Sequence, residues 1–279
     1  GYPSLFKGSR NSGFFGTELI AGGFIVKLFF ISTLFFITKK QNLFLFLYIF
    51  FAMFVVFLTG ERMSFLYFLL GITCFLFYFK NNKTKITFVV SFLIIIFSIF
   101  FLNPKNKERM YDNFYKILKY GVYADTGEYY KTDKNDFYII NSGWGAHWLA
   151  AKNIFLDSPI VGKGLRSFRF ICHEKKYETI SANDKSRCST HPHNFYLEIL
   201  ADLGIVGFFL FLLIIVIYFQ KLFKYANNDH FFLIKLINLL IIFWPIATTG
   251  SIFSNNYASM FWYILSISLF NSLKKEVKN

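Results

Sequence analysis

Two histidines near residue 190 are of the residue type that acid–base chemistry uses. They stand in the segment 190–194 (THPHN), directly before a long apolar run. Proline is suited to the first position of a helix, so we expect the helix to begin at Pro192 with His191 as its N-cap. His193 would then lie in the first turn, where the positive end of the helix dipole favours neutral imidazole. Because a general base must be neutral to accept a proton, His193 is the candidate catalytic residue.

Polar side chains accompany these histidines at helical spacing. Steps of three and four residues bring one set to the same side of the expected helix: His191, Asn194, Glu198 and Asp202. Acidic groups inside a membrane-spanning run are costly and usually face a polar cavity. We therefore expect Asn194 and Glu198 to orient an acceptor or the histidine.

Two other interpretations of the histidines stay open. His193 could do no more than cap a helix at a membrane interface. His191 and His193 could also bind zinc, although residues two apart point away from each other on a helix and no obvious Cys or His partners accompany them.

Arginine is scarce in this lysine-rich chain, so each arginine is informative. The planar guanidinium group binds phosphate through two parallel hydrogen bonds, which makes arginine a fitting phosphate ligand. We expect Arg109 and Arg187 to be solvated surface residues. Arg169 fits either role and is kept with the candidate phosphate ligands, which are Arg10, Arg62, Arg166 and Arg169.

The composition indicates an integral membrane protein. Of 279 residues, 55% are hydrophobic and 16% charged, whereas soluble domains average about 25% charged residues. The aromatic residues fill long unbroken runs, which excludes a soluble enzyme, a disordered protein and a disulfide-rich secreted module. The formal net charge of +14 would suit nucleic acid, but the lysines stand in short clusters between apolar runs. Membrane topology explains that pattern better, and we expect no nucleic-acid partner.

Seven apolar runs can be read as membrane-spanning helices: 17–38, 43–58, 64–79, 86–102, 195–219, 231–248 and 256–271. Lysines follow the first, third, fifth and last runs, which places those connections in the cytoplasm by the positive-inside rule. The remaining connections would face the periplasm. The predicted fold is therefore an all-α polytopic membrane protein with about seven transmembrane helices. The chain begins at Gly1 rather than Met, and we expect further spans upstream.

Three parts follow from this topology: four membrane helices with outer-face turns over 1–102, a large periplasmic loop over 103–194, and three membrane helices over 195–279. Within the loop, helical spacing predicts interfacial helices over 112–123 and 145–156. Cys172 and Cys188 also lie in the loop, where they could pair in an oxidising periplasm or remain free thiols.

Four segments resemble the O-antigen ligase and O-antigen polymerase superfamily, in the same order along the chain. The pattern that begins at His193, His-Asn-x-x-x-Glu-x-x-x-Asp-x-Gly-x-x-Gly, resembles the family pattern that follows its long outer loop. Arg10 opens a stretch similar to the family's Arg-x-x-Gly, and residues 59–62 (TGER) resemble its Ser/Thr-Gly-x-Arg turn. Residues 157–168 (DSPIVGKGLRSF) resemble its outer-loop segment. Together these segments extend over nearly the whole chain.

The resemblance implies a GT-C-like membrane glycosyltransferase of the bacterial inner membrane that acts at the periplasmic face. It would transfer a glycan from an undecaprenyl-pyrophosphate carrier to an acceptor sugar, the lipid A core or a growing chain, with inversion and without a metal or other cofactor. His193 would be the essential histidine, and the arginines would hold the pyrophosphate. Ligase and polymerase both stay open. The alternative is a multi-spanning transporter of a lipid-linked or anionic solute, but the chain lacks the repeated halves that many transporters have.

Overall fold

The computed structural model describes most of the chain, with gaps. The described residues are 6–7, 10–11, 13–15, 20–79, 81–102, 122–123, 129–130, 142–181, 184–224, 226, 231–245 and 250–273. The helix expected over 112–123 lies outside them except for Val122 and Tyr123, which form a short strand and not a helix. The chain forms two compact units: the first comprises Gly1–Tyr115, Ala226–Phe243 and Phe270–Asn279, and the second Lys116–Tyr225 and Trp244–Leu269.

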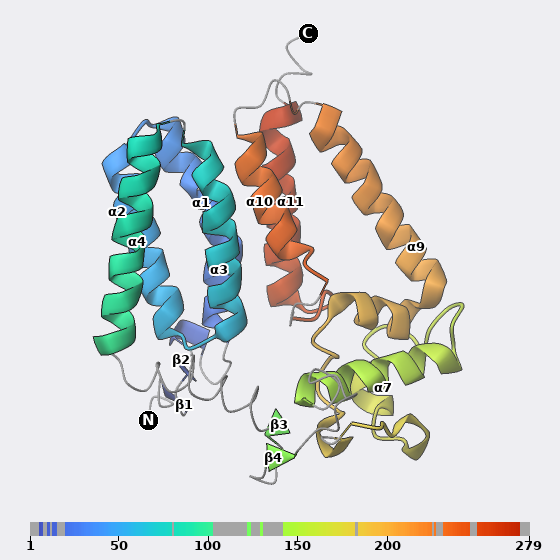
Figure 1. The fold of residues 1–279 in the computed structure, drawn as a ribbon. Helices are drawn as coiled ribbons and strands as arrows, with labels where there is room; N and C mark the ends of the chain where they lie inside the picture. Colours follow the sequence, from blue (N-terminus) through green and yellow to red (C-terminus); the bar gives the residue numbers. More distant parts are fainter. Residues whose placement is uncertain are drawn as a thin grey trace. The chain divides into compact units, whose positions relative to one another are not determined.

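Helices dominate both units (Figure 1). The first unit contains η1 Gly13–Phe15, α1 Ala21–Thr38, α2 Asn42–Leu58, α3 Arg62–Phe75, η2 Leu76–Tyr78, α4 Asn82–Leu102 and α10 Phe232–Ile242. The second contains α7 Gly143–Asp157, α8 Phe168–Ile171, η4 Lys175–Tyr177, η5 Asp184–Ser186, α9 Phe195–Lys224 and most of α11 Asn255–Leu273. Four short strands in the described part of the chain form antiparallel pairs, β1 Phe6–Lys7 with β2 Arg10–Asn11 and β3 Val122–Tyr123 with β4 Tyr129–Tyr130. The predicted helical class is confirmed.

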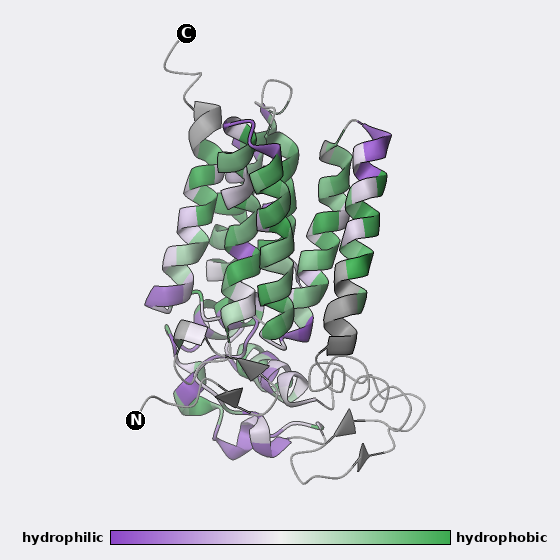
Figure 2. Cartoon of the chain, turned by 90° about the vertical axis from the view of Figure 1, so that its left-hand side faces the viewer, coloured by the Kyte–Doolittle hydropathy of each residue, from purple (hydrophilic) through white to green (hydrophobic). Residues whose placement is uncertain are grey.

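Two of the described helices are long and apolar enough to cross a membrane. They are α1 with 18 residues and α9 with 30, and three shorter apolar helices accompany them, α2, α3 and α10. Figure 2 shows the long helices hydrophobic over most of their length, with hydrophilic residues concentrated near helix ends. The number of spans and the side of the membrane that the long loop faces stay predictions.

Aromatic side chains fill the core of the first unit. The Phe29 ring of α1 lies 4.9 Å from that of Phe68 in α3 and stacks on Tyr48 of α2 at 5.2 Å, centroid to centroid. Gly71 of α3 lies against the Phe30 ring, which a Cβ at this position would overlap. A small residue here lets α1 and α3 approach closely, as is common between membrane helices.

In the second unit, α9 is broken at Gly204. Its φ of 63° and ψ of −163° interrupt the helix and leave backbone groups on both sides without helical partners. The loop 158–164 supplies those partners through four hydrogen bonds of 2.8–3.2 Å, donor first: Lys163 to Ala201, Gly164 to Asp202, Ile205 to Pro159 and Val206 to Ile160. Two of the segments that carry the sequence resemblance therefore pack directly on each other.

A small apolar core joins α7, α8 and the start of α9. Its buried members are Ala150, Ala151, Ile154, Phe168, Cys172, Tyr177 and Ala201. Cys172 is bonded to Cys188, with their Cα atoms 5.4 Å apart, so of the two states open to these cysteines the structure has the disulfide. The bridge fixes the chain five residues before His193 and thus connects this core to the histidine segment.

Candidate functional site

His193 lies just before α9 rather than inside its first turn. The helix begins at Phe195, and Asn194 is its N-cap, since Asn194 Oδ1 accepts the N–H groups of Tyr196 at 3.1 Å and Leu197 at 3.2 Å. The prediction that the helix begins at Pro192 with His191 as N-cap is wrong. The physical reason is that asparagine is among the strongest N-cap residues, so the cap forms at Asn194.

The backbone at His193 is unusual for a side chain with a Cβ. Its φ is 55°, in the left-handed region that costs a non-glycine residue about 1–2 kcal/mol. Such strain is commonly found where the surroundings hold a functional group in place. Here the Asn194 cap fixes the following residue, and Asn194 Nδ2 also donates to the carbonyl of Pro245 at 2.8 Å. The imidazole is therefore held at a fixed turn.

Three aromatic rings surround the His193 imidazole. Ring centroids lie 4.2 Å away for His191, 4.7 Å for Trp144 and 5.2 Å for His147. His147 is buried, and its Nδ1 lies 3.0 Å from the carbonyl oxygen of Arg187. Because a carbonyl can only accept, His147 must donate from Nδ1, which fixes its tautomer when neutral. The sequence did not identify Trp144 or His147 as site residues. It predicted only a helix over 145–156, which includes His147 and begins one residue after Trp144.

These surroundings determine the protonation state of His193. Burial, followed by the positive charge that His191 and His147 carry when protonated, holds the pKa of His193 well below its usual value. The imidazole is therefore neutral at physiological pH. The neutral form was expected from the helix dipole, whereas in the structure desolvation and neighbouring imidazoles cause it.

The polar residues within α9 bind other parts of the second unit. Glu198 accepts a hydrogen bond from the Ser251 hydroxyl and one from the Ile252 N–H at 3.0 Å. Asp202 accepts the Arg166 N–H at 2.6 Å and the Ser167 hydroxyl at 3.0 Å. Glu198 thus connects α9 to the segment before α11, and Asp202 connects it to the loop before α8. The expected role of Glu198 toward an acceptor stays a prediction.

Two of the candidate phosphate-binding arginines lie in this unit. Arg166 has a φ of 59° and an exposed side chain, so the Asp202 contact fixes its backbone while the guanidinium reaches solvent. Arg169, one turn later in α8, has its Nε atom buried without a hydrogen-bond partner among the described residues. An unpaired buried N–H of a charged group is costly, so a bound anion at this position would be stabilising.

The other two candidate arginines lie in the first unit. Arg62 is the first residue of α3 and is half-buried. The preceding Glu61 carboxylate accepts the N–H groups of Gly22 at 2.7 Å and Gly23 at 3.1 Å, at the start of α1. This contact fixes the turn that carries Arg62. Arg10 lies in β2, opposite Lys7 of β1.

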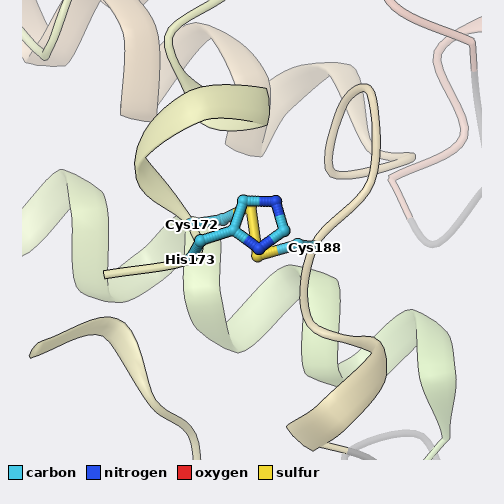
Figure 3. Close-up of side chains that lie close together, drawn as sticks. All are labelled: Cys172, His173 and Cys188. Atoms are coloured by element: carbon cyan, nitrogen blue, oxygen red, sulfur yellow. A yellow bond between two sulfur atoms is a disulfide. The ribbon is translucent and has the colours of Figure 1, made fainter. Parts of the chain in front are cut away.

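Cys172, His173 and Cys188 lie close together in the second unit (Figure 3). Their potential ligand atoms are all within 4.8 Å of one another. Since the two sulfurs are bonded to each other, neither offers the thiolate that a metal would bind. In this state the group is a disulfide beside an exposed imidazole.

Comparison with known proteins supports a single family. A family model described as O-Antigen ligase matches residues 46–212, more than half of the chain and the part that contains His193. A protein of Rickettsia conorii described as a candidate polysaccharide ligase is 30% identical over 103 residues, which are 35% of this chain. The match spans 25%, or about a quarter, of that relative's own length. No solved structure matches the chain.

Proposed function

Because this chain belongs to the O-antigen ligase family, which is membrane-integral, we propose that it transfers a glycan from an undecaprenyl-pyrophosphate carrier to an acceptor sugar. The reaction takes place at the periplasmic face of the bacterial inner membrane, in a multi-pass protein that serves lipopolysaccharide or other surface polysaccharide synthesis. The acceptor is the lipid A core for a ligase and a growing chain for a polymerase. The observation that carries the proposal is the neutral, backbone-constrained His193 inside the matched region.

In this proposal His193 acts as the general base. The imidazole takes the proton from an acceptor hydroxyl as that oxygen attacks the anomeric carbon of the donor. The new C–O bond forms as the bond from the anomeric carbon to the pyrophosphate oxygen breaks, so the configuration inverts and the carrier pyrophosphate leaves. The negative charge of a bound pyrophosphate would raise the pKa of His193 toward the working pH, where a general base is most effective.

Arginines stabilise the leaving pyrophosphate. Negative charge develops on that group as the bond breaks, and fixed guanidinium donors stabilise it where it develops. Arg169 is the best-supported member because its buried Nε lacks a partner among the described residues. Arg166 stands three residues earlier on a constrained backbone with an exposed side chain. Arg10 and Arg62 take the same role in the proposal, which needs no metal.

Transfer assays on membranes that contain the full chain test this proposal. His193→Ala should reduce glycan transfer by roughly 10²–10⁴-fold, the usual cost of losing a general base, while lipid-linked donor still binds. His173→Ala is the matched control, since His173 is an exposed histidine of the same unit, and it should retain transfer. Chelators should leave the rate unchanged. Transfer that survives in His193→Ala, or movement of an intact lipid-linked glycan across the membrane, would overturn the proposal and favour a transporter.

A further inference from the structure

An exposed tryptophan stands beside the candidate base. Trp144 keeps 41% of its surface exposed although its ring centroid lies only 4.7 Å from that of His193. The two rings meet at 80°, so one presents its edge to the face of the other. A large aromatic side chain that is fixed next to a reactive group, yet remains accessible, is an available surface for a ligand.

The position of Trp144 is fixed by its helix. Ser142 is the N-cap of α7, and its side chain accepts the Gly145 N–H at 3.1 Å, so the first turn is well defined. Trp144 and His147 are three residues apart and therefore lie on one face of the helix, with ring centroids 6.0 Å apart. The indole is thus held in the same ring cluster as the imidazoles of His147 and His193.

We propose that Trp144 is the platform on which the acceptor sugar ring stacks, with the attacking hydroxyl directed at His193. A pyranose presents a face of C–H groups whose hydrogens carry partial positive charge, and the face of an indole carries partial negative charge. Stacking therefore binds the sugar through its C–H face and leaves its hydroxyls free for hydrogen bonds and proton transfer. The hydroxyl groups at the rim of a ring stacked on Trp144 would lie next to the imidazole.

The assignment to the acceptor follows from charge. The donor carries a pyrophosphate, whose natural ligands are the arginines, whereas Trp144 offers an uncharged apolar surface. The acceptor is the substrate that must present a hydroxyl to the base, and Trp144 is the exposed ring among the three that lie beside the base. This inference rests on the proposed function and adds the acceptor-binding residue to it.

Steady-state kinetics on the full chain tests the platform. Trp144→Ala should raise the acceptor KM by roughly five- to tenfold, the loss expected for one aromatic contact, while the donor KM and kcat change by less than about twofold. Trp144→Phe should recover most of the affinity because it restores an aromatic face. Trp262→Ala is the matched control: Trp262 is 44% exposed in the same unit, and its loss should leave the acceptor KM unchanged. An unchanged acceptor KM in Trp144→Ala would overturn the platform.

A binding measurement separates failure of the platform from failure of the proposed function. A free acceptor oligosaccharide, added without donor to the purified full chain, should quench tryptophan fluorescence in the native protein and not in Trp144→Phe. If the native chain transfers no glycan but this difference is seen, the proposed reaction fails and the sugar site stands. If quenching is the same in both proteins, Trp144 is not the platform, whatever the transfer assay gives.

Discussion

At the scale of single residues, substitutions of His193 can distinguish its effect on catalysis from its effect on stability. A φ of 55° suits glycine better than any residue with a Cβ, so His193→Gly should fold more stably than His193→Ala, by about 1 kcal/mol. Both variants lack the imidazole and should be equally inactive. Thermal unfolding in detergent together with a transfer assay measures the two effects. Equal stability of the variants would mean that the left-handed turn costs the chain nothing.

Because the pKa of His193 is lowered in the folded protein, the free energy of unfolding should depend on pH in a direction that can be predicted. The unfolded histidine binds a proton below its ordinary pKa of about 6.5, whereas the folded imidazole resists protonation. Below that pH the unfolded state therefore holds more protons, and stability falls as the pH falls. The melting temperature should drop between about pH 7.5 and 5.5, and His193→Asn should drop less because asparagine tolerates the left-handed turn and does not titrate. Identical slopes in the two proteins would contradict this.

At the scale of elements, the contact between the loop 158–164 and the break in α9 depends on a glycine. A Cβ at Gly162 would overlap the backbone of Asp202, whereas the space around Gly164 is open. Both glycines have positive φ, 69° and 100°, so alanine is strained at either position by about 1–2 kcal/mol. Gly162→Ala should lose roughly a further 1–3 kcal/mol through the overlap, which thermal unfolding of the two variants can measure. Equal losses would mean that the contact is loose.

The disulfide should support both stability and the histidine segment. Cys172 and Cys188 are 16 residues apart, and closing a loop of this size contributes about 3 kcal/mol. The bridge also fixes Arg187, whose carbonyl holds His147 beside His193. Cys188→Ser should therefore lower both the melting temperature and glycan transfer, and reductant should do the same to the native chain. Cys74→Ser removes the free cysteine and serves as the control; a Cys188→Ser protein as stable and active as Cys74→Ser would exclude this role.

Apolar runs and the helical spacing of apolar residues predicted the helices well, because both patterns are local in the sequence. The run 195–219 became α9 with the same first residue, and the spacing over 145–156 became α7. The run 231–248 continued too far, since α10 ends at Ile242 and Pro245 follows, a residue that disfavours helix just before it.

Contacts between segments that are far apart in the sequence could not be predicted from apolar runs or spacing. The His193 turn depends on the sign of one dihedral angle and on the Asn194 cap. The ring of Trp144 reaches His193 through the packing of α7 on α9, across about fifty residues of sequence. The motifs predicted that His193 acts together with Arg10, Arg62, Arg166 and Arg169. The structure places His193, Arg166 and Arg169 in the second unit, and Arg10 and Arg62 in the first.

At the scale of the whole molecule, the two compact units do not follow the order of the chain, because each unit combines segments that are separated in the sequence. Two segments far apart in sequence, α1 and α10, pack together in the first unit, and α9 pairs with the segment before α11 in the second. The first unit therefore contains helices from both sides of the long loop 103–194, whereas the second contains helices from within that loop and from after it. The helices before and after this loop must therefore insert into the same membrane. Their connections can be tested together as one topology.

The positive-inside rule gives that orientation, because lysine-rich short connections are retained in the cytoplasm. Reporter fusions after Lys83 and Lys224 should read cytoplasmic, since each lies in a lysine-rich segment that follows an apolar run, 64–79 and 195–219. A fusion after Lys134, within the long loop, should read periplasmic, as should one in the loop before α8, which carries Arg166. A cytoplasmic reading at Lys134 would place the long loop and His193 on the cytoplasmic side, opposite to the periplasmic face of the proposed transfer. Such a result would overturn the proposed reaction together with the topology, because base and acceptor must meet on one side.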